Sequence, residues 1–363
     1  MMKTDSVSSN PRRIFAAVII LAAGSLCLLY AAQNIPAFAN WYTEHIYSIL
    51  VETIGRFWGI FPFSAVEFGL YLTILVFILS LIYAIRKKRP AAWGANVLLF
   101  ASILFFTYTI CCGINYGHSS FSETTGITTS SYTAEELASV CELLTEQLNE
   151  LAPEISCAED GTSLMGKKMV PRNAKKAMDH IGTLYDELDG YYPLPKRLTV
   201  SEILSYQNLS GIYSPFTIEA NYNDDMTEYN LPFTACHELS HLRGFMQEEE
   251  ANFIAFLACV NADSPEFRYS GYMLGWLYAT NQLYHADYDA YERIHSMLNN
   301  QSRTDLAANT QFWNTYDGQI AEVSNQINDS YLKANGQDDG VASYDRMVDL
   351  IMAYYNQSFL LFD

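Results

Sequence analysis

The residues with the clearest chemical meaning form the segment His237-Glu238-Leu239-Ser240-His241. On a helix, positions i and i+4 lie one turn apart on the same face, so both imidazoles can reach a single zinc ion. Zinc lowers the pKa of a bound water molecule to about 7, and a carboxylate beside the open coordination position can take its proton as the water attacks a carbonyl. The pattern therefore predicts one Zn²⁺ per chain held by His237 and His241, with Glu238 as the general base of a hydrolase.

A zinc ion in a hydrolase usually has three protein ligands, so a further residue must complete the site. Gly244 offers a turn at the end of the motif helix, and Glu248, Glu249 and Glu250 follow shortly after it. An acidic run of this kind is also typical of a solvated helix start. From position alone, each of the three glutamates is a candidate third ligand.

The order Glu248-x-x-Ala251-Asn252 resembles the Glu-x-x-Ala/Ser-Asp element of gluzincins. In that family the glutamate is the third ligand and the aspartate steadies a ligand histidine, which implies these roles for Glu248 and Asn252. The chain departs from the pattern in having Asn for Asp and a short spacing of seven positions after His241. The motif is also similar to that of metzincins, but their third histidine falls at Gln247 here, and glutamine is a poor zinc ligand.

Zinc hydrolases commonly add a side chain that stabilises the oxyanion, because donors aimed at developing charge supply much of the rate. The candidates are Tyr272, Tyr269 and His285, with Tyr272 preferred. Aromatic residues at helical spacing are more often part of a core.

Three apolar stretches precede the motif, at about residues 14–32, 65–85 and 95–114. Each approaches the roughly 20 apolar residues that a membrane-spanning helix needs. The first could alternatively be a signal peptide, since Ala37-Phe38-Ala39 resembles a cleavage site, but its apolar run is longer than a usual signal core.

Positive charges predict the orientation of these spans, because Lys and Arg are retained on the cytoplasmic side. Arg12 and Arg13 precede the first span and Arg86-Lys87-Lys88-Arg89 separates the second from the third, whereas Arg56 is the one Arg or Lys of the loop 33–64. The N-terminus, residues 1–13, is therefore expected in the cytoplasm. The aromatic-rich loop 33–64 is expected as an amphipathic segment at the outer interface, and residues 115–363 as a domain outside the cytoplasm.

The charge of the chain divides in the same place. Of its 363 residues, the first 114 carry a net charge of +4 and the remainder −23. An apolar, slightly basic front joined to a strongly acidic domain is typical of a membrane-anchored protein. The absence of a basic patch in the acidic part argues against a nucleic-acid partner.

The pattern of the acidic part predicts an α+β domain that is mostly α-helical. Helices are expected at 132–151 and 173–188, and the chain is expected to be helical from Leu231 nearly to its end. Between them, 197–203 and 211–221 are rich in strand-forming residues and bounded by Gly, Pro and Asn, so they are expected to form a small sheet.

Several features together resemble an uncharacterised bacterial family of predicted multi-pass membrane zinc peptidases. These features are the three spans and the segments 213–216, 219–221, 237–245 and 250–253. The resemblance implies a zincin-like domain in which an edge strand pairs with an extended substrate. The residues expected to bind substrate are then Tyr213, Ser214, Pro215 and Phe216.

Two classes of function remain. The first is a membrane-anchored zinc metallopeptidase that hydrolyses peptides or proteins outside the cytoplasm. The second is a catalytically silent zinc-binding sensor or scaffold in the lipid bilayer. Glu238 favours the enzyme, because a binding module has no need of a general base beside two ligands.

Overall fold

The computed structural model describes residues 11–360 and is mostly helical (73%), with one small mixed sheet of three strands. Residues 1–10 of the predicted cytoplasmic segment and 361–363 of the predicted outer domain lie outside the described residues. The helices and strands are α1 (Pro11–Asn34), α2 (Pro36–Tyr42), η1 (Thr43–Tyr47), α3 (Ser48–Leu50), η2 (Val51–Gly55), α4 (Arg56–Gly59), α5 (Ala65–Arg86), α6 (Pro90–Cys111), η3 (Gly113–Gly117), α7 (Phe121–Thr125), α8 (Ala134–Leu151), η4 (Ala152–Glu154), α9 (Val170–Ile181), η5 (Asp186–Leu188), β1 (Lys196–Arg197), α10 (Glu202–Tyr206), β2 (Gly211–Ser214), β3 (Glu219–Tyr222), α11 (Asn230–Arg243), α12 (Glu248–Val260), α13 (Pro265–Ala286), α14 (Tyr288–Met297), α15 (Asn300–Tyr316), α16 (Gln319–Ala334), η6 (Gly340–Arg346) and α17 (Met347–Leu360).

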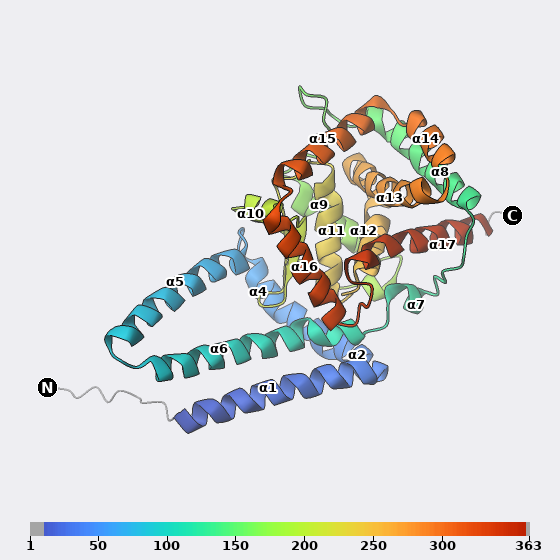
Figure 1. The fold of residues 1–363 in the computed structure, drawn as a ribbon. Helices are drawn as coiled ribbons and strands as arrows, with labels where there is room; N and C mark the ends of the chain where they lie inside the picture. Colours follow the sequence, from blue (N-terminus) through green and yellow to red (C-terminus); the bar gives the residue numbers. More distant parts are fainter. Residues whose placement is uncertain (1–10, 361–363) are drawn as a thin grey trace.

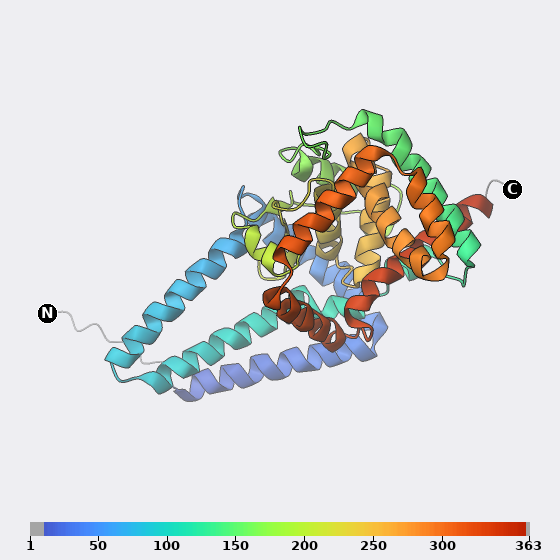
Figure 2. The same ribbon diagram turned by 45° about the horizontal axis from the view of Figure 1, so that its top comes forward.

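Three helices are long and apolar enough to cross a membrane, as the sequence predicts. They are Arg12–Asn34, Ala65–Arg86 and Pro90–Gly117, with mean hydropathies of 2.5, 2.5 and 2.2. Figures 1 and 2 show them extending away from the rest of the chain, with α5 and α6 joined at their far ends and diverging toward the folded domain, residues 115–360. The basic residues 86–89 lie at that far junction.

The segment between the first two apolar helices is helical and two-faced. Tyr42, Tyr47 and Val51 are buried in the hydrophobic core that continues into the folded domain, while Trp41 and Phe57 are exposed. The segment therefore has one face buried in the protein and another that is exposed. Because the core contains residues from Ala32 to Ala353, the folded domain shares its interior with this segment.

Two buried glutamates connect the folded domain to the start of α5. The carboxylate of Glu219 on β3 accepts hydrogen bonds from Ala65 N (3.1 Å) and Val66 N (2.9 Å) and forms an ion pair with Lys196. The carboxylate of Glu67 accepts hydrogen bonds from the backbone of Thr199 and Val200. Glu67 therefore connects the start of α5 to the folded domain.

We expect Glu219→Gln to destabilise the full-length protein by about 3 kcal/mol, because the variant leaves the buried Lys196 ammonium without its counter-charge. The measurement is thermal or denaturant unfolding in detergent. Glu52→Gln is the matched control: Glu52 pairs with Arg56 on the surface, where an ion pair contributes at most about 1 kcal/mol. Equal effects of the two variants would contradict the anchoring role of Glu219.

The sheet differs in detail from the prediction. Residues 211–221 form a hairpin of two short strands rather than one long strand, because the chain turns at Pro215–Ile218. The first predicted strand is reduced to β1, and the helix α10 begins at Glu202, within the range predicted as strand. The strand order is β1-β3-β2, with β1 parallel and β2 antiparallel to β3, so β2 is an edge strand.

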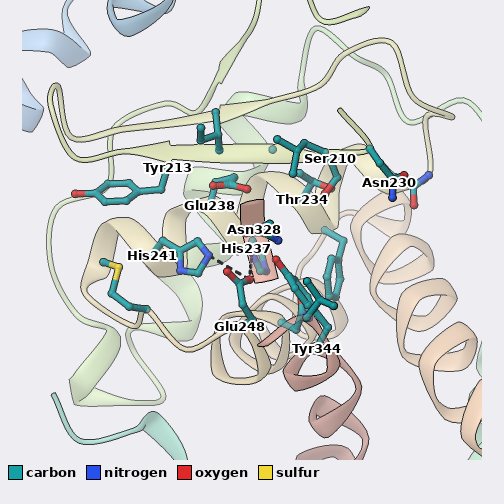
Figure 3. A pocket seen from close by; sticks show the side chains of 18 of the residues that line it. Ser210, Tyr213, Asn230, Thr234, His237, Glu238, His241, Glu248, Asn328 and Tyr344 are labelled. Atoms are coloured by element: carbon teal, nitrogen blue, oxygen red, sulfur yellow. Dashed lines mark ion pairs between the residues drawn. The ribbon is translucent and has the colours of Figure 1, made fainter. Parts of the chain in front are cut away.

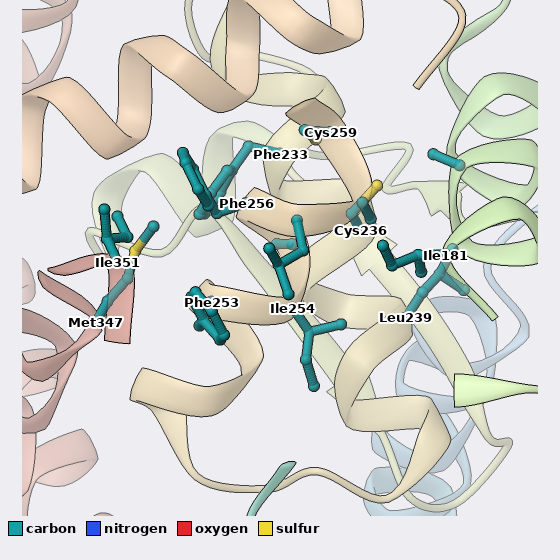
Figure 4. Close-up of a cluster of buried hydrophobic side chains, with 14 of the residues drawn as sticks. Ile181, Phe233, Cys236, Leu239, Phe253, Ile254, Phe256, Cys259, Met347 and Ile351 are labelled. Atoms are coloured by element: carbon teal, nitrogen blue, oxygen red, sulfur yellow. The ribbon is translucent and has the colours of Figure 1, made fainter. Parts of the chain in front are cut away.

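The core of the folded domain is built around α11 and α12. Figure 4 shows Leu239 and Cys236 of α11 against Ile254 of α12, with Ile181 of α9 on one side and Met347 of α17 on the other. The apolar side chains of α11 and α12 are therefore covered from both sides. This packing fixes the direction in which the opposite face of α11 points.

Candidate metal centre

The motif helix ends in a turn that brings the following acids back toward the histidines. Gly244 has φ +111°, a backbone conformation that glycine adopts without steric cost. Phe245 N donates to Ser240 O at 3.2 Å, which closes the helix end. The chain then starts α12 at Glu248, within reach of the helix that it has just left.

His237, His241 and Glu248 form a compact buried cluster (Figure 3). One ligand atom from each lies within 4.8 Å of the others. Glu248 Oε2 is 3.3 Å from His237 Nε2 and 3.6 Å from His241 Nε2. The three donors that the motif and the gluzincin resemblance suggest therefore converge on one point.

The chemistry of this cluster fits a zinc ion. His241 Nδ1 lies 2.8 Å from Phe245 O, and donation to that carbonyl orients Nε2 toward Glu248, where it can bind a metal ion once its own proton is lost. Glu248 Oε2 is buried and has no hydrogen-bond partner among the described residues. Two imidazoles and one carboxylate are a donor set typical of a catalytic zinc.

Asn252 lies next to the cluster, one helical turn after Glu248. Burial and the neighbouring His241 lower the pKa of His237, against the raising effect of Glu248 and Asn252. His237 Nδ1 and Asn252 Nδ2 are buried without a hydrogen-bond partner among the described residues, so the structure does not contain the bond to His237 that the gluzincin resemblance implies for Asn252.

The two alternative ligands bind elsewhere. Glu249 forms an ion pair with Arg346 at 2.7 Å and accepts a hydrogen bond from Gln337. Glu250 accepts hydrogen bonds from the backbone and hydroxyl of Ser122 on α7. Among the three consecutive glutamates, the structure thus directs only Glu248 toward the histidines.

Burial and neighbouring charges set the protonation of the cluster. Burial alone raises the pKa of Glu248, but His241 and His237 outweigh it and hold that pKa well below its usual range. Burial lowers the pKa of His241, but the charge and hydrogen bond of Glu248 raise it to about 9. At neutral pH the cluster therefore holds an ionised carboxylate and a protonated imidazole. A divalent cation can bind in place of the imidazole proton.

Glu238 lies beside the cluster and against the edge strand. Its side chain is 3% exposed, and burial raises its pKa to about 8. Glu238 Oε2 has no hydrogen-bond partner among the described residues. Gly211 of β2 packs directly on it, because a Cβ at that position would lie 2.3 Å from Glu238 Oε1.

A cavity of about 690 Å³ contains these residues. Its walls come from β2, α11, α12, α16, η6 and the domain end of α6, and they include Gly211, His237, Glu238, Asn328 and Tyr344. Figure 3 shows β2 on one side of the cluster and Tyr344 on the other. An extended chain of several residues fits such a volume.

The predicted oxyanion residues are not at this site. Tyr272 does not line the cavity and packs edge-on against Phe256 with ring centroids 6.3 Å apart. Tyr269 donates to Asp305, and His285 is exposed at the end of α13. The expectation for Tyr272 is therefore corrected: its spacing on α13 directs it into the core.

Tyr344 is the aromatic residue that sequence reasoning missed. It lines the cavity, and burial together with the charge of Glu248 raises the pKa of Tyr344. It lies about one hundred positions after the motif in a 3-10 segment without a recognisable pattern. Only the fold brings it to the site.

The predicted substrate-binding residues divide into two groups. Pro215 and Phe216 line the cavity, and Phe216 is exposed. Tyr213 contributes to the wall, but its hydroxyl is buried and bonds to Tyr47 and to Cys111 O. Ser214 is buried, does not line the cavity and accepts a hydrogen bond from Thr217.

The fold and the site define a mostly helical protein with three membrane-type helices and a buried His-His-Glu cluster in a cavity. The chain belongs to the family described as Protein of unknown function (DUF3810), whose model matches residues 42–352. The matched range begins within the helical segment before α5, which agrees with the shared core of that segment and the folded domain. Neither the curated proteins nor the solved structures contain a match to this chain.

Proposed function

We propose that this protein is a membrane-anchored zinc metallopeptidase with a zincin-like catalytic domain. The observation that carries the proposal is the position of Glu238. It is a buried carboxylate beside three convergent ligand atoms, and it lies directly under an edge strand. A domain that only binds a metal needs the ligands, but it does not need this fourth residue or an adjoining cavity.

Each group of the site then has a distinct role. His237, His241 and Glu248 hold the zinc ion, which when bound polarises water and the scissile carbonyl. Glu238 accepts the proton of the attacking water and passes it to the leaving amine. Its Oε2 atom is buried and has no hydrogen-bond partner among the described residues, so it is free to accept that proton.

The edge strand β2 positions the substrate. Its side away from β3 offers backbone donors and acceptors to an extended peptide, whose residues then pass over Glu238. Gly211 permits this close approach of strand and carboxylate.

The location of the enzyme follows from the charges. With residues 86–89 and the N-terminus on the cytoplasmic side, three crossings put the folded domain outside the cytoplasm. Its substrates are then peptides or proteins on that side of the bilayer.

The direct test measures zinc and cleavage in the same sample. Purified full-length protein is expected to contain one zinc per chain and to cleave members of a randomised peptide library, with both properties lost on chelation and restored by zinc. Zinc without cleavage would favour the sensor or scaffold, and absence of zinc binding would refute the proposal.

We expect Gly211→Ala to lower kcat/KM by about 100-fold, because the added Cβ must displace Glu238 from its place beside the ligands. Zinc content should be unchanged, since Glu238 is not a ligand. The measurement is peptide cleavage with zinc analysis. Gly318→Ala is the matched control, because a Cβ there meets nothing within 4 Å. A similar loss in both variants would contradict the role of Gly211.

We expect Tyr344→Phe to lower kcat by about 100-fold with little change in KM, as when one oxyanion donor is removed. Tyr344 lines the cavity, and the charge of Glu248 contributes to raising the pKa of its hydroxyl. Steady-state kinetics and zinc affinity are measured together. Weaker zinc binding with unchanged kcat in the loaded enzyme would instead make Tyr344 a positioning residue for Glu248.

A further inference from the structure

The cavity reaches the membrane-type helices. Tyr108 and Cys112 line its wall, and both lie in the apolar helical segment Pro90–Gly117. The candidate catalytic residues lie on one wall of the cavity, and the end of an apolar helix lies on another. The cavity therefore adjoins the surface of the bilayer that this helix would cross.

The edge strand is fixed to the same ends. On the two sides of the β2–β3 turn, Tyr213 donates to Cys111 O at the end of α6, and Glu219 binds the first backbone amides of α5. The turn that follows the proposed substrate-binding strand therefore lies next to the ends of both membrane-type helices.

Helix α16 contributes another wall of the cavity and also has an exposed apolar face. Asn325 and Asn328 line the cavity. Ile320, Val323 and Ile327, at the spacing of one helical face, are 59%, 54% and 64% exposed. An exposed apolar row of this kind marks a surface that contacts a membrane or a partner.

The position of α16 favours the membrane as the occupant of this face. The Tyr331 ring packs on Tyr108 and Tyr116 with centroid distances of 6.2 Å each, and its hydroxyl bonds to Tyr108. Figures 1 and 2 both show α16 lying beside the domain end of α6. The apolar row is therefore continuous with the end of a membrane-type helix, where an amphipathic helix lies in the interface.

We propose that the substrate of this site is a polypeptide anchored in the same bilayer and cleaved in the extended segment directly next to its anchor. This inference rests on the proposed peptidase activity. Ile212 on the edge strand and Phe216 in the turn after it are exposed at one wall of the cavity, and α16, the helix that carries the apolar row, contributes another wall. A chain that leaves the bilayer therefore enters the cavity between elements with exposed apolar side chains.

The test compares two tethered substrates with the full-length protein in vesicles of phosphatidylethanolamine and phosphatidylglycerol. A randomised peptide library is attached to a transmembrane anchor either directly or through a rigid helical spacer of about 20 residues, which holds it about 30 Å away. Both forms have the same local concentration, so the comparison isolates distance from the bilayer. We expect the directly attached form to be cleaved at least about tenfold faster than the form with the spacer. This difference in rate should be lost in Ile327→Asp and kept in the control Gln326→Asp.

A second measurement does not depend on activity. An environment-sensitive fluorophore is attached to Ile327→Cys or to Gln326→Cys, in a chain whose exposed Cys27 and Cys157 are replaced by serine. Lipids carrying a quencher in the bilayer should quench the label at 327 more strongly than the label at 326.

The outcomes separate the two proposals. Equal cleavage of both tethered forms, or equal quenching at the two positions, would overturn the membrane-adjacent substrate while leaving the peptidase intact. Cleavage of neither form by zinc-loaded protein would refute the peptidase and this inference with it.

Discussion

Glu238→Gln is expected to lower kcat/KM for peptide cleavage by about 10²- to 10⁴-fold while the protein keeps its fold and its zinc. The amide has the size of the carboxylate but cannot accept a proton from water at neutral pH. The carboxylate is buried beside the ligands but is not one of the three atoms that converge, so its loss should leave the metal in place. Activity on a peptide library and zinc content are measured on the same preparation.

Glu249→Gln is the matched control for this result. It makes the same chemical change in another largely buried glutamate, whose partners are Arg346 and Gln337 outside the cluster. Activity of the control should stay close to that of the unmodified protein. Residual activity of Glu238→Gln at the level of this control would show that another group moves the proton.

Glu248→Gln is expected to weaken zinc binding by more than about 100-fold, a larger effect than the loss of a residue that only orients a ligand. The carboxylate supplies the negative charge that lies 3.3 and 3.6 Å from the two imidazole nitrogens, and an amide lacks that charge. His237→Ala should have an effect of the same order. Zinc affinity is measured by competition with a chelator of known strength.

The three neighbouring glutamates make this test specific. Glu249→Gln and Glu250→Gln change the same residue type at the next two positions, where the side chains bind Arg346 and Ser122. These variants should retain zinc affinity. If Glu249→Gln lost the metal and Glu248→Gln kept it, the assignment of the third ligand would be wrong.

The elements with strong local signals were predictable from the sequence. The three apolar helices follow from long runs of apolar residues, and their observed bounds lie close to the predicted ones. The helix predicted at 132–151 is present as α8, which begins after Thr133 with a capping box of Thr133 and Glu136. Where local preference was weak, the prediction failed: 211–221 forms a hairpin, and α9 ends at Ile181 rather than continuing to Leu188.

The sequence by itself determined the motif on a helix, the membrane-type helices and the presence of acids that could complete a metal site. These depend on spacing within one helical turn or on composition along one segment, which tertiary contacts do not change. Only the tertiary structure distinguished Glu248 from Glu249 and Glu250, since the direction of each side chain depends on the angle at which α12 leaves the turn at Gly244. The tertiary structure also placed Tyr344 rather than Tyr272 in the cavity, and it put the site against the end of α6. These contacts join segments that are far apart in the chain, and the packing of the common core brings those segments together.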